Sequence, residues 1–189
     1  MVQANCVVPI ETMTGLHEYR IDYYVTELPG GDAVNAAILK QYRALADSAE
    51  TKRSHYFAGR YENIYLPERS LPALQPLLAA ARQAACRFLR HEQPALAVGF
   101  WFNEMLPGHR TLPHSHDEDD ELASGVYYVS VPGNSGDLIL SQGAAVTRIT
   151  PREGMLVLFA PQVVHEVSTN LSGATRLSIG MNFGVRDVV

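Results

Sequence analysis

The sequence predicts an α+β domain in which a helical N-terminal half supports a C-terminal antiparallel jelly-roll. Two amphipathic helical patterns precede residue 95, and seven short β-rich runs with Pro- or Gly-containing turns follow it, with no helical pattern between them. A chain of 189 residues with 47% hydrophobic residues is long enough to close one core. We therefore expect a single domain over residues 1–189, with helical support at about 1–94 and the jelly-roll core at about 95–184.

The first helix is expected over 32–48. Val34, Ile38 and Leu45 recur there at helical intervals, behind Asp32, which can cap the first turn. The second helix is expected over 71–91, with its prolines confined to the first turns. Its apolar side would carry Leu74, Leu77, Leu78, Ala81, Ala85, Phe88 and Leu89. Both helices should pack against the sheet.

The strands are predicted from runs rich in β-branched and aromatic residues. These runs lie at 95–105, 124–131, 136–141, 145–150, 154–160, 163–168 and 174–183. Many short strands separated by turn residues are typical of an antiparallel sandwich or barrel.

Composition excludes several classes of partner. The net charge is -5 and only 19% of residues are charged, so there is no broad basic field for nucleic acid or anionic lipid. No apolar stretch reaches the roughly 18 residues that a membrane span requires, and the first residues do not resemble a signal peptide. We expect a cytoplasmic protein with no nucleic-acid or membrane partner. There is no P-loop, dinucleotide fingerprint or Ser-His-Asp arrangement to indicate a nucleotide-binding protein or a hydrolase.

Two histidines, His114 and His116, stand one residue apart in "PHSHDEDDE". Side chains in a strand alternate between faces, so both can converge on one metal ion. His165, a single imidazole among valines in "VVHEVS", is the candidate third ligand. The alternative is that these are ordinary surface or core histidines. The acidic run 117–121 is interpreted mainly as a solvated loop.

Arg176 and Ser178 alternate with Leu177 and Ile179, so the two polar side chains share one face of a strand. A guanidinium inside a β-barrel is costly unless it meets an anion, and its planar fork fits a carboxylate. This pattern favours an anionic ligand. The alternative is an ion pair with a nearby acid at the barrel mouth.

The order of these motifs resembles the iron(II)- and 2-oxoglutarate-dependent oxygenase superfamily. It starts with W-x-N at 101–103 and the H-x-H motif, followed by "SGVYY" at 124–128, "GMLVLFAP" at 154–161, His165 and R-x-S. The resemblance is closest to a small bacterial and phage group with the same motifs, and it covers about 95–184. It implies a double-stranded β-helix, Fe(II), 2-oxoglutarate as cosubstrate and O2. The expected activity is hydroxylation of a small molecule or a protein side chain.

The resemblance also implies roles for individual residues. His114 and His165 would bind iron, and Arg176 with Ser178 would hold the far carboxylate of 2-oxoglutarate. Tyr128 and Asn103 would lie beside the cosubstrate. Most of the superfamily has H-x-D or H-x-E, whereas here His116 stands at the carboxylate position. Either three imidazoles bind the iron or Asp117 reaches back, and strand alternation favours His116.

Two other interpretations stay open. A cupin-like metalloenzyme that does not use 2-oxoglutarate would take Glu121 as a fourth ligand. However, a cupin's second histidine follows a Pro-x-Gly within a few residues, whereas here a full strand separates Gly154 from His165. A non-catalytic jelly-roll that binds a metal or a small ligand is the third interpretation. A homodimer is also left open. The remaining histidines are interpreted as surface residues, with His109 and Arg110 near a substrate mouth; they are His17, His55, His91 and His109.

Overall fold

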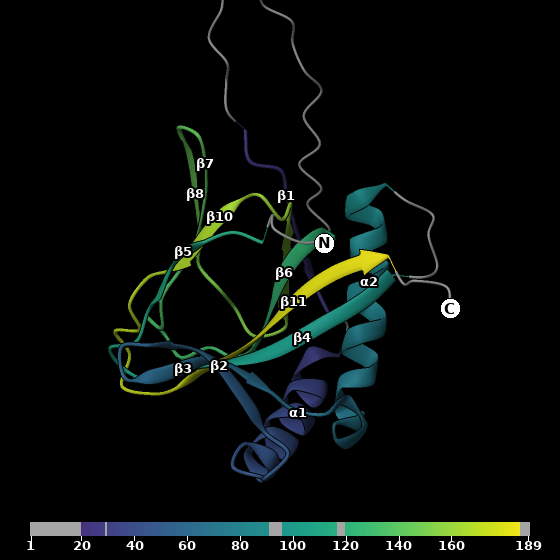
Figure 1. The fold of residues 1–189 in the computed structure, drawn as a ribbon, viewed down its shortest axis with the longest axis vertical. Helices are drawn as coiled ribbons and strands as arrows, with labels where there is room; N and C mark the ends of the chain where they lie inside the picture. Colours follow the sequence, from purple (N-terminus) through teal and green to yellow (C-terminus); the bar gives the residue numbers. More distant parts are fainter. Residues whose placement is uncertain (1–19, 29, 91–95, 117–119, 186–189) are drawn as a thin grey trace, which may run out of the picture.

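The computed structural model describes residues 20–28, 30–90, 96–116 and 120–185, and in them two antiparallel sheets face each other (Figure 1). The larger sheet has seven strands in the order β1 (Tyr23–Glu27), β9 (Met155–Phe159), β6 (Glu121–Ser130), β11 (Arg176–Val185), β4 (Leu96–Met105), β3 (Arg60–Tyr65) and β2 (Lys52–Phe57). The smaller sheet has four, in the order β5 (Thr111–His114), β10 (Val164–Val167), β7 (Leu138–Gln142) and β8 (Ala145–Ile149). This is the predicted jelly-roll.

Alternation along β6 and β11 divides the core into two parts. Tyr127 and Ile179 join a cluster with the helices, whereas Tyr128 joins residues of β7 and β9 between the two sheets. We call the side of β4, β6 and β11 that carries Tyr128 and Ser178 the interior face, because it is turned toward the smaller sheet. The functional residues predicted on these strands lie on this face.

Both predicted helices are present, with shifted ends. The first, α1, runs from Gly31 to Leu45, and the second, α2, from Gln75 to Leu89, after two short 3-10 turns at 68–70 and 72–74. The capping prediction for Asp32 was wrong. Gly30, in the left-handed conformation at φ 70°, is the N-cap, and Asp32 lies in the first turn with no side-chain cap hydrogen bond.

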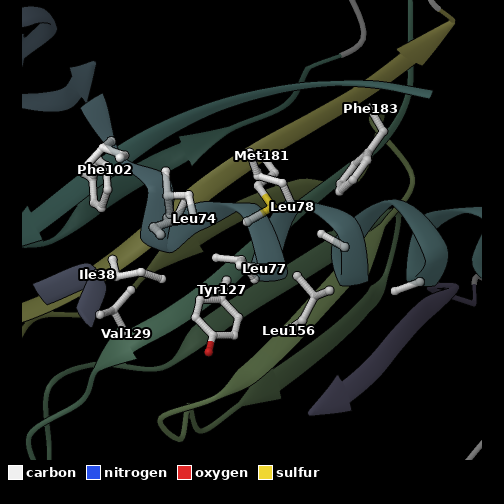
Figure 2. Packing of buried hydrophobic residues seen from close by; sticks show 14 of the residues in the cluster. Ile38, Leu74, Leu77, Leu78, Phe102, Tyr127, Val129, Leu156, Met181 and Phe183 are labelled. Carbon is white, nitrogen blue, oxygen red and sulfur yellow. The ribbon is translucent and has the colours of Figure 1, made fainter. Parts of the chain in front are cut away.

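The helices bury their apolar side against the larger sheet, as predicted (Figure 2). Leu74, in the 3-10 turn just before α2, and Leu77 and Leu78 of α2 form one cluster with Met181 and Phe183 of β11, and each of the three leucines is at most 1% exposed. Apolar burial of this kind contributes about 1.5–3 kcal/mol for each large side chain. The cluster therefore fixes α2 against the side of the larger sheet opposite the interior face.

A substitution in this cluster tests the packing. Leu78→Ala is expected to lower the free energy of unfolding by about 2–5 kcal/mol, because Leu78 is fully buried and its removal leaves a cavity. The matched change Leu171→Ala, at a side chain that is 79% exposed, should change it by less than about 0.5 kcal/mol. Chemical denaturation of both variants measures the difference, and equal losses would contradict the packing described.

Three strands were not predicted: β1, β2 and β3. The strand expected at the H-x-H motif is present as β5, but it ends at His114. The N-terminal part of the chain is therefore not only helical, since β1 pairs with β9 and the β2–β3 hairpin extends the larger sheet beyond β4. β2 and β3 read "KRSHYF" and "RYENIY" and contain many polar residues, so the apolar alternation that marks a strand is weak. All seven predicted runs form strands. Among the described helices, none is long and apolar enough to cross a membrane.

Candidate metal centre and anion pocket

Three imidazoles converge between the sheets. His114 ends β5 and pairs directly with His165 on β10, and their ring centroids are 4.2 Å apart. The ring of His116 lies 5.2 Å from that of His114 and 5.1 Å from that of His165. Each histidine offers one nitrogen, and these nitrogens lie within 4.8 Å of one another. The arrangement can hold one metal ion, and it brings together the three histidines that the sequence predicted.

Backbone carbonyls orient two of these rings. The Nδ1 atom of His114 lies 2.9 Å from the carbonyl oxygen of Leu112, and Nδ1 of His165 lies 3.1 Å from that of Val163. A carbonyl oxygen only accepts, so each Nδ1 must carry the proton and donate it. The lone pair of a neutral ring is then on Nε2. Metal-binding histidines usually have this second hydrogen bond, so these residues fit a divalent metal ion.

His116 reaches the cluster by a different route from the one predicted. We expected it on the same strand as His114, but β5 ends at His114 and His116 lies beyond it. Its backbone N–H donates to the carbonyl oxygen of Pro161 at 2.9 Å, which ties this segment to the turn before β10. The indole of Trp101 lies beside it, with 5.8 Å between ring centroids. The expectation of convergence held, but strand alternation is not its cause.

Burial keeps two of the imidazoles neutral. Burial, together with charge repulsion from the neighbouring His114, lowers the pKa of His165 to about 3 and that of His116 to about 4. Phe159 covers one side of the site, with its ring centroid 4.8 Å from that of His165. Metal binding requires deprotonated imidazoles, so at neutral pH these two rings release no proton when they bind a metal.

In the part of the chain that the structure describes, no carboxylate joins the three histidines. Asp117, the alternative third ligand, lies outside the described residues. Glu121, the fourth ligand of the cupin-like interpretation, is not part of the group. It accepts a hydrogen bond from Asn182 instead, at 3.0 Å.

Trp101 depends on a glycine beneath it. A Cβ on Gly180 would lie 2.5 Å from Cε2 of the Trp101 indole, far closer than van der Waals contact allows. Gly180→Ala is therefore expected to push the indole toward His116 and lower metal affinity about tenfold or more, in the range seen when groups around a metal site are disturbed. Gly99→Ala is the matched control, since its Cβ would meet nothing within 4 Å. Metal titration of both apoproteins tests this, and equal affinities would show that Trp101 has no part in the site.

A second cluster lies further along the interior face. The side chain of Arg176 is buried at 1% exposure, with Cζ 5.2 Å from the centroid of the Tyr128 ring. Its Nη1 donates to the carbonyl oxygens of Gly136 at 2.7 Å and Ser135 at 3.3 Å. Burial lowers the pKa of Arg176, and Tyr128 and Asp137 partly offset the effect. The guanidinium is therefore anchored at one nitrogen, below the surface.

Three polar atoms around this guanidinium are buried without a hydrogen-bond partner. They are Nε of Arg176, the hydroxyl of Tyr128 and Oγ of Ser135. Burial raises the pKa of Tyr128 to about 12, so its hydroxyl keeps its proton and can donate. No described carboxylate forms an ion pair with Arg176, so the alternative of a structural ion pair is not found in this part of the chain. A buried cation without an anion costs several kcal/mol, and these free donors fit an anionic ligand.

The other predicted polar residues lie on the same rung of the sheet. Ser178 pairs with Tyr128 on one side and with Asn103 on the other, so the three share the interior face. Ser178 is 2% exposed. The Asn103 amide, however, donates to the carbonyl oxygen of Glu62 at 2.8 Å and to Oδ1 of Asn63 at 3.2 Å. Its amide nitrogen therefore fastens β3 to β4.

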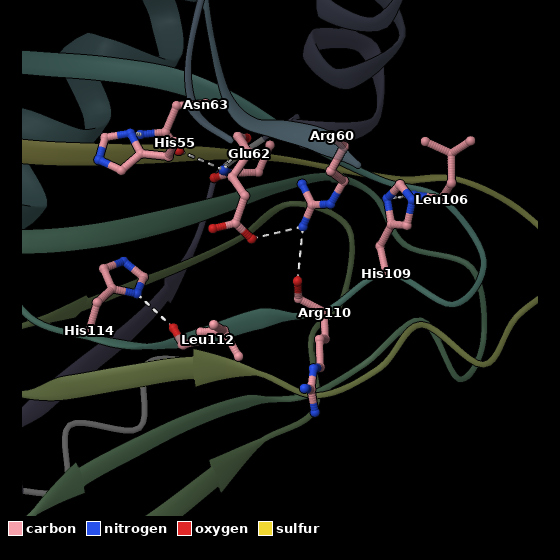
Figure 3. A network of polar contacts seen from close by, with 10 residues as sticks. His55, Arg60, Glu62, Asn63, Leu106, His109, Arg110, Leu112 and His114 are labelled. Atoms are coloured by element: carbon pink, nitrogen blue, oxygen red, sulfur yellow. Dashed lines mark hydrogen bonds and ion pairs between the residues drawn. The ribbon is translucent and has the colours of Figure 1, made fainter. Parts of the chain in front are cut away.

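An arginine bridges β3 and the segment that precedes β5 (Figure 3). Nη2 of Arg60 donates to Oε1 of Glu62 and to the carbonyl oxygen of Arg110, both at 2.9 Å. This links β3 to the residue just before β5, the strand that carries His114. His109, the other predicted rim residue, lies alongside and accepts a hydrogen bond from the backbone N–H of Leu106 at 3.2 Å.

His55 was predicted to be a surface residue, and the structure confirms this, but the sequence did not indicate that it lies near His116. His55 is exposed, but its Nδ1 lies 2.7 Å from Oγ of Ser54 and 3.1 Å from Nδ2 of Asn63 (Figure 3). It is close enough to His116 to lower the pKa of that ring by charge repulsion. Its backbone has φ 58°, which is uncommon for a residue other than glycine and recurs at functional sites. No spacing in the sequence marks it.

The part of the chain that carries both clusters matches a family model. Residues 99–182 match the model of a family described as "Putative 2OG-Fe(II) oxygenase". The matched segment contains all three clustered histidines, Tyr128 and Arg176. A comparison with curated protein sequences finds no match.

Solved structures share the fold at low sequence identity. A prolyl-4-hydroxylase from Pseudomonas putida is 22% identical with a TM-score of 0.68, over 88% of this chain and 94% of that one. A prolyl hydroxylase from Trichoplax adhaerens, solved with a peptide of hypoxia inducible factor, is 17% identical with a TM-score of 0.67, over 86% and 83%. The carbocyclase SnoK of nogalamycin biosynthesis, which depends on α-ketoglutarate, is 14% identical with a TM-score of 0.66, over 89% and 85%. Residues 99–182 thus match the model of the 2OG-Fe(II) oxygenase family, and the chain has the double-stranded β-helix fold of these solved structures.

Proposed function

We propose that the protein is a dioxygenase that uses iron(II) and 2-oxoglutarate to hydroxylate a small molecule or a protein side chain. One observation carries the proposal: the three-histidine cluster lies between the sheets, and the interior face beside it carries a buried arginine that forms no ion pair with a described carboxylate. Arg176 is four residues along β11 from Gly180, which lies beneath Trp101 at the metal cluster. At the strand rise, this is about 13 Å. A five-carbon diacid and an extended arginine side chain together can span that separation.

The residues of the chain have separate tasks in this proposal. His114, His116 and His165 hold the metal, and the free Nε of Arg176 with the hydroxyl of Tyr128 receives the far carboxylate of 2-oxoglutarate. Iron(II) with bound 2-oxoglutarate supplies the activation of O2 and the oxidation of a C–H bond. The protein contributes position and exclusion of water, the latter through the ring of Phe159 beside His165.

Ser178 and Asn103 have smaller proposed roles. Ser178 is buried on the same rung as Tyr128, so its hydroxyl is available to the carboxylate held by Arg176. Asn103 uses its amide nitrogen to hold β3. We therefore propose that Asn103 contacts the cosubstrate only through its remaining oxygen, and that its main task is to keep β3 in place at the mouth.

Succinate formation tests the proposal. Iron-loaded protein under air, with 2-oxoglutarate and a panel of small molecules and peptides, should convert 2-oxoglutarate to succinate with matching O2 uptake. The cupin-like alternative predicts O2 uptake without succinate, and a non-catalytic jelly-roll predicts neither. If 2-oxoglutarate neither binds nor is consumed in the iron-loaded protein, the proposal is wrong.

A further inference from the structure

A bulge in β6 changes the direction of one acidic side chain. On β11, Asn182 pairs with Ser124 and Phe183 with Ala123, but Gly184 pairs with Glu121, so Leu122 is an extra residue in β6. In a regular strand Glu121 would share the face of Ala123, which is packed against the helices. The extra residue turns Glu121 onto the interior face beside Asn182, because a bulge re-aims the side chains next to it.

Glu121 is held there by one oxygen only. Nδ2 of Asn182 donates to Oε1 of Glu121 at 3.0 Å, and Oδ1 of Asn182 accepts from Oγ of Ser124 at 3.1 Å. Oε2 of Glu121 is buried and has no hydrogen-bond partner. A buried carboxylate oxygen without a donor costs free energy, so this arrangement is suited to a ligand that brings a donor.

The position of this group separates it from the cosubstrate. Asn182 is two residues beyond Gly180, about 7 Å along the strand, in the direction opposite to Arg176. Ser124 pairs with Phe159, the residue whose ring contacts His165. The metal cluster therefore lies between the Arg176 pocket on one side and Glu121 on the other. With 2-oxoglutarate on the Arg176 side, the Glu121 side is left for the substrate.

The sheet is open beside Asn182, the residue that holds Glu121. Gly99 of β4 pairs with Asn182, and a Cβ built on Gly99 would meet nothing within 4 Å. Gly99 is exposed to solvent. The interior face is therefore open next to the Glu121–Asn182 pair.

We propose that Glu121, positioned by Asn182, binds a cationic nitrogen group of the substrate, an amine or a guanidine. The inference rests on the proposed function, because it takes the metal centre as the place of reaction. It names a substrate class, and the charge of Glu121 decides that class. An N–H-bearing cation would give Oε2 the donor that it lacks and neutralise the carboxylate at the same time.

Matched cationic and neutral probes test the inference. L-arginine with L-citrulline and L-lysine with L-norleucine are added without O2 to the protein loaded with Fe(II) and 2-oxoglutarate, and the change in the visible absorbance of that complex is titrated. Arginine or lysine should bind the wild type about tenfold to a hundredfold more tightly than its neutral partner, as expected for a charge-assisted hydrogen bond. In Glu121→Gln, which keeps an acceptor for Asn182, this preference should disappear.

Glu153→Gln is the control. Glu153 is exposed and its Oε1 accepts the backbone N–H of Val131, a bond that glutamine can retain. It should keep the preference for the cationic probes. The inference is overturned if no cationic probe binds, if neutral and cationic probes bind the wild type equally, or if Glu121→Gln behaves as wild type. In each of these cases 2-oxoglutarate can still bind normally, whereas failure of 2-oxoglutarate itself to change the iron spectrum would instead refute the proposed function.

Discussion

His165→Ala is expected to lower the affinity for Fe(II) by at least about a hundredfold. Its ring lies within 4.2 Å of His114 and 5.1 Å of His116 by ring centroids, and its loss leaves two imidazoles from one short segment. Disturbing a group that merely orients a metal ligand already costs about ten- to a hundredfold. Anaerobic competition with a chelator of known affinity measures the loss.

His109→Ala is the matched control for this change. His109 accepts a hydrogen bond from Leu106 and is not one of the three clustered histidines, so iron affinity should be unchanged. Thermal unfolding of the metal-free proteins shows whether both variants keep the fold. Unchanged iron affinity in a folded His165→Ala protein would place the metal elsewhere.

Arg176→Lys is expected to weaken 2-oxoglutarate binding about tenfold to a hundredfold while iron stays bound. Lysine keeps the charge, but it loses the planar fork whose Nη1 is anchored on Gly136 and whose Nε is free for a ligand. A hydrogen bond to a charged group is worth about 1.5–3 kcal/mol, which gives this range. Arg176→Leu should bind more weakly still, because it removes the charge as well. Calorimetric titration of 2-oxoglutarate into the iron-loaded variants provides the comparison.

Arg148→Lys controls for a general change in arginine content. Arg148 pairs with Asp137 at 3.2 Å on the surface and should not affect 2-oxoglutarate. Both Arg176 variants must retain iron for the comparison to be valid, since the metal cluster is expected to be independent of Arg176. Equal 2-oxoglutarate affinity in wild type and Arg176→Leu would make Arg176 a structural residue.

The strands of the core were predictable because their residues alternate between two environments. In "RLSIGMNF", the apolar positions Leu177 and Ile179 pack toward the helices, and Arg176 and Ser178 point inward, as alternation requires. The β2–β3 hairpin has no such alternation, since it extends the edge of the sheet and most of its residues stay partly exposed. A strand without a buried face leaves little pattern in the sequence.

The residue types that bind ligands at the site could be predicted from the sequence. The positions of Glu121 and His55 could not. His114, His165 and Arg176 carry distinctive chemistry at family positions. By contrast, Glu121 faces the interior only because of a bulge at Leu122, and the register of a pairing cannot be read from one strand alone. The position of the His55 ring depends on a positive φ and on two side-chain hydrogen bonds, which exist only in the folded chain.

The claim that joins the metal cluster to Arg176 is tested most directly by titrating 2-oxoglutarate into the Fe(II)-loaded wild-type protein without O2. A keto acid that chelates iron gives a visible charge-transfer band. We predict that this band appears, saturates at one 2-oxoglutarate per chain, and is absent when the metal is Zn(II) or when His165 is alanine. Iron-loaded wild type that shows no such band, or that binds 2-oxoglutarate equally well without metal, would contradict it.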